Sequence, residues 1–153
     1  MAKVANKTFT LVAPSNRHGL IQEIESLAEQ AAAYAGLAED ERDSLAIAVT
    51  EVGNNAIIHG NKRSADKKVY LTIDAGAEGV KVVLRDEGVG FNPENLSNPL
   101  DPENLLRESG RGVFIMRSLM DEVTFEFGKG GTEVTIIKRK KSLSGDSASK
   151  EPD

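Results

Sequence analysis

The chain has 153 residues, of which 39% are hydrophobic and 28% are charged, and its formal net charge is -5. This length and composition fit one domain with a sizeable core and argue against disorder throughout. The acidic balance argues against general nucleic-acid binding and membrane-surface binding, and the lack of cysteine excludes disulfides, cysteine-based zinc sites and thiol catalysis.

The first half of the chain predicts one strand followed by two helices. Residues 8–13 alternate between apolar and polar side chains, as a half-buried strand does. Ser15 is placed to cap a helix that runs to about Ala35, where Gly36 ends it. A second helix is expected from about residue 40 to residue 59. The apolar positions at helical spacing that would face the core are Leu20, Ile24, Leu27, Ala31 and Tyr34 on the first helix and Leu45, Ala48, Val49, Val52 and Ala56 on the second.

Two strands and a long connection are predicted next. Residues 68–75 and 80–85 alternate in the same way, and the glycine-containing stretch between them fits a hairpin turn. Residues 86–90 then leave the second strand as a loop. Residues 92–109 contain three prolines among Asn and Ser residues, and this length and composition predict a mobile lid.

The rest of the chain predicts a third helix over residues 113–120 and a final hairpin with strands over 122–127 and 132–138. We expect one domain over residues 1–139 and a disordered tail over residues 140–153, which are mainly Lys, Ser, Gly, Asp and Glu. This order of elements predicts the α+β class, a two-layer α/β sandwich in which helices cover one face of a mostly antiparallel mixed sheet.

Glu51, Asn55 and His59 are spaced four residues apart, so on a helix they would follow one line beside the apolar face. Polar side chains at such a margin need partners, and a bound Mg²⁺ with its waters would provide them. Asn55 offers the ion a neutral oxygen, and Glu51 could take a proton from an attacking hydroxyl. An exposed helix face with an ordinary ion pair or cap also fits the spacing, so both interpretations stay open.

Asp86 follows a predicted strand and precedes Gly88 and Gly90. The two glycines would let the backbone turn sharply and approach a flat ligand closely, and the Asp86 carboxylate can accept a hydrogen bond from an exocyclic amine. Thr132, in the last hairpin, would be free to assist near Asp86. An ordinary turn is the alternative at this position.

Gly110-Arg111-Gly112-Val113 comes just before the third predicted helix. Backbone N–H groups at a helix N-terminus favour anions, and glycines leave room for phosphate oxygens. Arg111 or Arg107 could add positive charge near a terminal phosphate. A flexible loop with a surface arginine is again the alternative.

The three stretches, residues 51–60, 86–91 and 110–113, resemble the N, G1 and G2 boxes of the GHKL ATPases, which share the Bergerat ATP-binding fold. Residues 110–123 are similar to the version found in anti-sigma-factor serine/threonine protein kinases. The resemblance implies that Glu51 is the general base and that Asn55 is a Mg²⁺ ligand. The other implied ATP contacts are Asp86 at the adenine amino group, Gly90 and Thr132 beside the ring, and Gly110, Arg111, Gly112 and Val113 at the phosphates.

The same resemblance implies an ATP-dependent serine/threonine kinase that phosphorylates a Ser on an anti-anti-sigma antagonist protein and sequesters a sigma factor, usually as a homodimer. Direct partnership with nucleic acid or membrane is not expected. Residues 1–7 contain no apolar run, and no stretch is long enough to span a bilayer. A cytoplasmic protein is therefore the simplest expectation.

Other functions stay open beside this one. A catalytically inactive, nucleotide-regulated protein-binding module would use the same pocket only to set its shape for a partner. An ATPase subunit of the DNA-repair or topoisomerase type is disfavoured by the short chain. Nucleic-acid binding through the basic residues 137–141 is weaker still, because a short basic run at a strand end is more typical of a solvated terminus.

Overall fold

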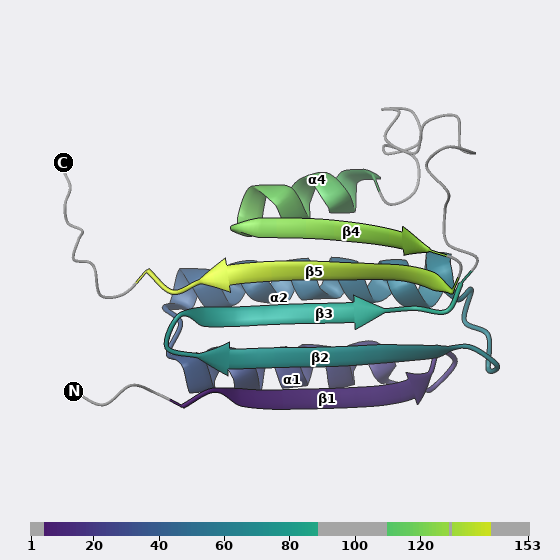
Figure 1. Ribbon diagram of the computed structural model, residues 1–153, viewed down its shortest axis with the longest axis horizontal. Helices are drawn as coiled ribbons and strands as arrows, with labels where there is room; N and C mark the ends of the chain where they lie inside the picture. Colours follow the sequence, from purple (N-terminus) through teal and green to yellow (C-terminus); the bar gives the residue numbers. More distant parts are fainter. Residues whose placement is uncertain (1–4, 89–109, 129, 142–153) are drawn as a thin grey trace.

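The computed structural model describes residues 5–88, 110–128 and 130–141. Within these ranges the chain forms a five-stranded sheet with helices on one face (Figure 1). The strand order is β1-β2-β3-β5-β4, and each described pairing is antiparallel. The expected α+β class is thereby confirmed. The strands are β1 Lys7–Pro14, β2 Lys68–Gly76, β3 Gly79–Arg85, β4 Glu122–Gly128 and β5 Gly131–Arg139.

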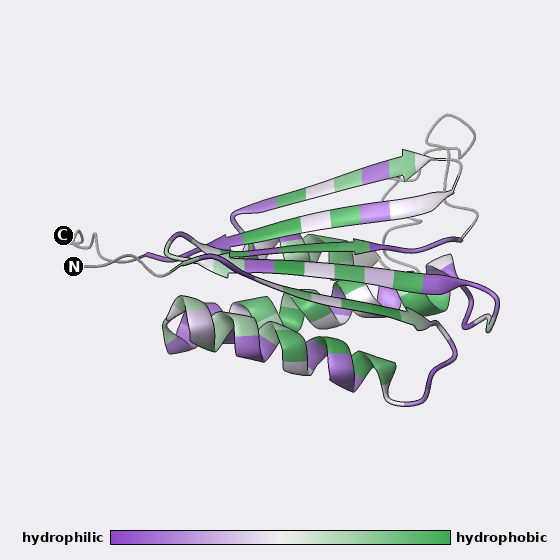
Figure 2. Cartoon of the chain, turned by 60° about the horizontal axis from the view of Figure 1, so that its bottom comes forward, coloured by the Kyte–Doolittle hydropathy of each residue, from purple (hydrophilic) through white to green (hydrophobic). Residues whose placement is uncertain are grey.

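The helical layer consists of α1 (Leu20–Ala35), α2 (Glu39–Asn54), a π-helix η1 (Asn55–Gly60) and α4 (Gly110–Leu119). Helices α1 and α2 pack against each other, and α4 packs on α2. Figure 2 shows hydrophobic and hydrophilic bands alternating along the strands, which matches a sheet with only one face covered. The described helices include none that is long and apolar enough to span a membrane.

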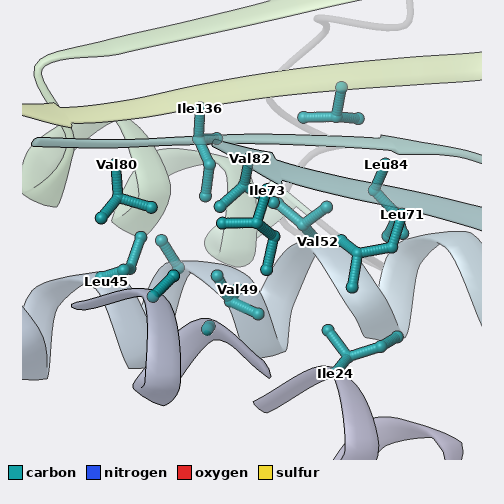
Figure 3. Close-up of a cluster of buried hydrophobic side chains, with 14 of the residues drawn as sticks. Ile24, Leu45, Val49, Val52, Leu71, Ile73, Val80, Val82, Leu84 and Ile136 are labelled. Atoms are coloured by element: carbon teal, nitrogen blue, oxygen red, sulfur yellow. The ribbon is translucent and has the colours of Figure 1, made fainter. Parts of the chain in front are cut away.

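The core lies between the sheet and the helices, and it consists mainly of aliphatic side chains (Figure 3). Burying one such side chain contributes roughly 1.5–3 kcal/mol. The alternation predicted from sequence places Val69, Leu71 and Ile73 of β2 on the covered face, each at most 1% exposed. The remaining buried side chains labelled in Figure 3 are Ile24, Leu45, Val49, Val52, Val80, Val82, Leu84 and Ile136.

The predicted cap of the first helix is wrong. Helix α1 begins at Leu20, and the residue before it is Gly19, whose φ is +78°. Ser15 is buried instead, and its Oγ lies 2.6 Å from the carbonyl oxygen of Ser64 and 3.0 Å from that of Lys67. The hydroxyl therefore bonds these distant carbonyls and not the first turn of α1. In this way Ser15 fastens the loop before β2 to the end of β1.

The second helix also differs from the prediction, because its last six residues form the π-helix η1. The backbone N–H of Asn61 donates to the carbonyl of Ala56 at 2.8 Å, five residues earlier. A π-turn holds more residues than an α-turn, so the side chains after Asn55 leave the line predicted for Glu51, Asn55 and His59. Such local π-turns are frequent at functional sites.

Candidate functional site

Asp86 lies just past the end of β3, at the end of the sheet where β5 begins (Figure 1). Its side chain is only 5% exposed. Oδ1 accepts hydrogen bonds from the backbone N–H groups of Gly88 at 3.0 Å and Thr132 at 3.2 Å. The Asp86 N–H in turn donates to the Thr132 carbonyl at 2.9 Å. The structure therefore brings Asp86, Gly88 and Thr132 together, and hydrogen bonds from their backbone N–H groups join them.

Burial raises the pKa of Asp86, and the N–H groups of Gly88 and Thr132 partly oppose this shift. Both of these hydrogen bonds go to Oδ1, so among the described residues Oδ2 keeps its capacity to accept another. A ligand N–H group that donated to Oδ2 would offset part of the cost of burying the charge. This is the property that recognition of an exocyclic amine requires.

Three glycines from different segments surround Asp86 so closely that side chains would not fit. A Cβ atom on Gly60 would lie 2.4 Å from Oδ2 of Asp86, and one on Gly131 would lie 2.0 Å from its carbonyl oxygen. A Cβ on Gly88 would lie 1.9 Å from the carbonyl oxygen of Gly60. The end of η1, the turn after β3 and the start of β5 thus meet around one carboxylate.

Asn61 and Gly131 lie outside the three stretches that the sequence predicts as the site, and Gly60 has no predicted role of its own within the first of them. Asn61 is 1% exposed, and its Oδ1 accepts a hydrogen bond from the N–H of Glu87 at 2.8 Å. The available signal for Asn61 was a polar residue directly after a glycine at a helix end. The sequence does not show that its hydrogen-bond partner is Glu87.

Glu51 and Asn55 lie on successive turns where α2 meets η1. The N–H of Asn55 donates to the carbonyl of Glu51, and both residues are half-buried. Both residues are therefore partly exposed at the edge of the core, which is compatible with the expected roles of general base and metal ligand. His59 is exposed and belongs to the π-helix.

The Gly110–Val113 stretch lies inside a helix, which corrects the prediction that it precedes one. Helix α4 starts at Gly110, so Gly110, Arg111 and Gly112 form its first turn. Val113 is half-buried and packs against the core. The first turn of a helix carries unpaired backbone N–H groups, so the expected preference for anions is retained. Gly90, Arg107 and the predicted lid lie outside the described residues.

The histidine kinase-like ATPase domain family matches residues 15–138 of this chain. The chain belongs to this family. The predicted resemblance to anti-sigma-factor kinases is confirmed by curated relatives, among them the serine-protein kinase RsbW of Staphylococcus epidermidis. It is 33% identical over 111 residues, which cover 68% of this chain and 69% of the relative.

Two further relatives are anti-sigma F factors. That of Bacillus velezensis is 36% identical and that of Bacillus cereus is 40% identical, each over 104 residues that cover 65% of this chain and 70% of the relative. The histidine kinase-like ATPase domain of this chain is therefore of the serine/threonine protein kinase type found in anti-sigma factors.

Solved structures show the same fold at low identity. The RsbU and RsbW domains of a Mycobacterium tuberculosis protein align with a TM-score of 0.58 and 16% identity, over 87% of this chain and 32% of that chain. The histidine kinase domain of a blue-light-activated kinase from Erythrobacter litoralis aligns with a TM-score of 0.56 and 19% identity, over 90% of this chain and 66% of that chain.

Proposed function

We propose that this chain binds ATP and Mg²⁺, phosphorylates a Ser on an anti-anti-sigma antagonist protein, and sequesters a sigma factor. The observation that carries the proposal is the buried carboxylate of Asp86, whose Oδ2 accepts no hydrogen bond from the described residues and lies beside the backbone of Gly60. An acceptor at this position fits the amino group on the edge of adenine. ATP would supply the γ-phosphoryl group, and Mg²⁺ would neutralise charge on the phosphates.

The chain's own residues divide the remaining work. Asp86 would accept a hydrogen bond from the adenine amino group, with Gly88, Gly90 and Thr132 beside it. Asn55 would contribute an oxygen to Mg²⁺. The first turn of α4, Gly110-Arg111-Gly112-Val113, would bind phosphate oxygens through its N–H groups, with Arg107 adding positive charge.

Glu51 would act at the reacting hydroxyl. Its carboxylate would accept the proton as the Ser oxygen of the antagonist forms a bond to the γ-phosphorus, and ADP would leave with the electrons of the broken bond to phosphorus. Because phosphoryl transfer depends mainly on positioning and charge stabilisation, one misplaced group should slow it strongly. Positioned proton transfer typically contributes 10²–10⁴-fold.

The decisive experiment compares Glu51→Gln with the unsubstituted chain, using labelled ATP and a purified antagonist. We expect phosphoserine formation to fall by about 100-fold or more, while ATP affinity stays within a few-fold. Asp43→Asn, which removes an exposed carboxylate from the same helix, is the matched control and should transfer phosphate normally. Normal transfer by Glu51→Gln would remove Glu51 from this role.

The partners are proposed from the names of the relatives, which include a serine-protein kinase and anti-sigma F factors. We expect the purified chain to retain a sigma factor on a column when nucleotide is present, and to elute as a homodimer in light-scattering measurements. If the unsubstituted chain binds ATP but forms no phosphoserine with any antagonist, a nucleotide-regulated binding module would replace the kinase.

A further inference from the structure

A single buried amide joins three segments of the site. Asn61 follows η1 directly, and its Nδ2 donates to the carbonyl of Lys68 at the start of β2 at 2.9 Å. Its Oδ1 accepts from the N–H of Glu87 at 2.8 Å, and its own N–H closes η1 on Ala56. The helix that carries Asn55 is thereby tied to the strand layer and to the turn after β3.

Both polar atoms of the Asn61 side-chain amide form hydrogen bonds. The oxygen meets a donor and the nitrogen meets an acceptor, so no side chain without both functions could make the two bonds. Asn61 is 1% exposed, which means that water would not replace a lost partner easily. The Glu87 N–H and the Lys68 carbonyl would then both lose their hydrogen bond to Asn61.

The position of these bonds connects Asn61 to Asp86. Glu87 is the next residue after Asp86, so holding its N–H fixes the peptide that carries the carboxylate. Gly60, the residue before Asn61, lies against Oδ2 of Asp86. Asn61 therefore acts on the Asp86 carboxylate from two sides. Gly60, the residue before Asn61, lies against the carboxylate, and Glu87, whose N–H Asn61 binds, follows Asp86 in the chain.

The outer side of the same turn is also fastened. Glu87 accepts hydrogen bonds from the N–H of Lys68 at 2.7 Å and from the hydroxyl of Tyr70 at 2.6 Å. The guanidinium of Arg85 lies 4.0 Å from the centre of the Tyr70 ring. With Asn61 on the buried side and Tyr70 on the outer side, the turn has little freedom to rotate Asp86.

We propose that Asn61 is a positioning residue that orients Asp86 toward an amino-bearing purine edge and so sets the preference for adenine over guanine nucleotides. This inference rests on the proposed function, because it concerns the same pocket. Guanine presents a carbonyl where adenine presents an amino group, so a correctly aimed carboxylate repels it. A carboxylate that can rotate loses both the attraction and the repulsion.

The test measures the dissociation constants of Mg·ATP and Mg·GTP for three variants by titration calorimetry, and the KM and kcat for ATP in the phosphorylation assay. Asn61→Leu removes both hydrogen bonds while keeping a side chain branched at Cγ, and Asn61→Ser removes them with a small polar side chain. Ser15→Ala is the matched control, because Ser15 is also buried and holds the same loop before β2 without touching Glu87 or Asp86.

We expect both Asn61 variants to weaken ATP binding by about 10-fold or more, which is the loss expected when the hydrogen bond between Asp86 and the adenine amino group is no longer well aligned. The ratio of ATP to GTP affinity should fall with it, and KM for ATP should rise more than kcat falls. Ser15→Ala should lower the melting temperature and leave the affinity ratio unchanged. A purely structural Asn61 would behave like Ser15.

Two outcomes would overturn the inference while leaving the proposed function intact. One is an unsubstituted chain that prefers ATP together with folded Asn61 variants that keep the same ATP to GTP ratio. The other is failure of both Asn61 variants to fold while Ser15→Ala folds, which would make Asn61 a residue of the scaffold. Failure of the unsubstituted chain to bind ATP would instead remove the proposed function itself.

Discussion

Asp86 and Thr132 are joined by two hydrogen bonds, one from each backbone. The Asp86 N–H donates to the Thr132 carbonyl at 2.9 Å, and the Thr132 N–H donates to the Asp86 carboxylate at 3.2 Å. The first bond extends the β3–β5 ladder past its last pair, Arg85 and Glu133. The second bond holds the carboxylate of Asp86 against β5, the strand that contains Thr132. The register of the sheet therefore fixes the position of Oδ1, while Asn61 holds the turn that follows.

Asp86→Asn should reverse the base preference of the pocket. Because two N–H groups point at Oδ1, the amide oxygen of Asn must occupy that place, and its NH₂ group must occupy the place of Oδ2. That position then donates a hydrogen bond, which disfavours the amino group of adenine and favours the carbonyl of guanine. We expect ATP affinity to fall by about 10- to 100-fold in titration calorimetry, with GTP affinity unchanged or higher.

The same variant should not be less stable at neutral pH. Burial raises the pKa of Asp86, so keeping it ionised costs free energy of folding that a neutral amide does not incur. The melting temperature without nucleotide should be equal to or above that of the unsubstituted chain. A clear drop in melting temperature, or retained selectivity for ATP, would contradict this reading of the site.

Gly131→Ala should damage both stability and nucleotide binding. Gly131 has a φ of +137°, and a Cβ there would lie 2.0 Å from the carbonyl oxygen of Asp86. Backbone strain of this kind costs about 1–3 kcal/mol, and the collision must also displace the turn that carries the carboxylate. Chemical denaturation and ATP titration would measure the two effects.

The neighbouring glycines provide the control for this prediction. A Cβ on Gly128 or Gly130 would meet no atom of the described part of the chain within 4 Å, so Gly128→Ala should leave ATP affinity unchanged. Equal effects at Gly128 and Gly131 would show that the hairpin responds to any substitution. The specific role assigned to the contact between Gly131 and Asp86 would then be lost.

Glu87 should make stability depend on pH in the acid range. The hydroxyl of Tyr70 and the N–H of Lys68 lower the pKa of Glu87 below its ordinary value of 4.5. A lowered pKa means that ionised Glu87 stabilises the fold above pH 4.5, and that this contribution is lost as the pH falls through the lower folded value. Asp86, whose pKa is raised, has the opposite dependence.

Melting temperatures of the unsubstituted chain and Glu87→Gln, measured from pH 3 to pH 7, would isolate the contribution of Glu87 because that of Asp86 is common to both. We expect the difference between the two proteins to be constant near neutral pH and to shrink as the pH falls below 4.5. A difference that grows on acidification would mean that the carboxylate of Glu87 is not stabilised in the folded state.

The layered fold was predictable because it follows from local periodicity. Alternating residues such as Val69, Leu71 and Ile73 place their side chains on one face of a strand whatever the strand pairs with. The sequence does not contain a comparable signal for the π-helix. Val52 and Ala56 are four residues apart and fit a continuous α-helix as well as the observed change at Asn55.

The site was predictable only in part, for a related reason. The chemistry of Asp86 and the glycine beside it at position 88 can be read from residue types in a short stretch. The bond between Asn61 and Glu87 joins residues 26 positions apart, and only the sheet register brings them together. Ser15 failed as a predicted cap in the same way, because its distant carbonyl acceptors outweigh the local preference for a helix end.

Residues 140 and 141, at the C-terminal end of the described chain, should contribute to stability. Glu41 is 1% exposed, and its carboxylate accepts hydrogen bonds from the N–H of Ala38 at 2.7 Å and from the N–H of Lys141 at 2.8 Å. Lys140 donates its N–H to the carbonyl of Glu78 at 2.9 Å. These bonds fasten the chain after β5 to the start of α2 and to the β2–β3 turn.

Two truncations separate this contact from the residues beyond it. Removing residues 140–153 takes away the N–H of Lys141 and leaves a buried carboxylate oxygen of Glu41 without that donor, which should cost about 1–3 kcal/mol in chemical denaturation. Removing only residues 142–153 preserves both backbone donors and should change the free energy of unfolding little. Because Glu41 lies in the first turn of α2, at the opposite end of that helix from Asn55, neither truncation should alter the ATP to GTP affinity ratio. Equal stability of the two truncated proteins would mean that the Glu41–Lys141 bond contributes nothing to the folded state.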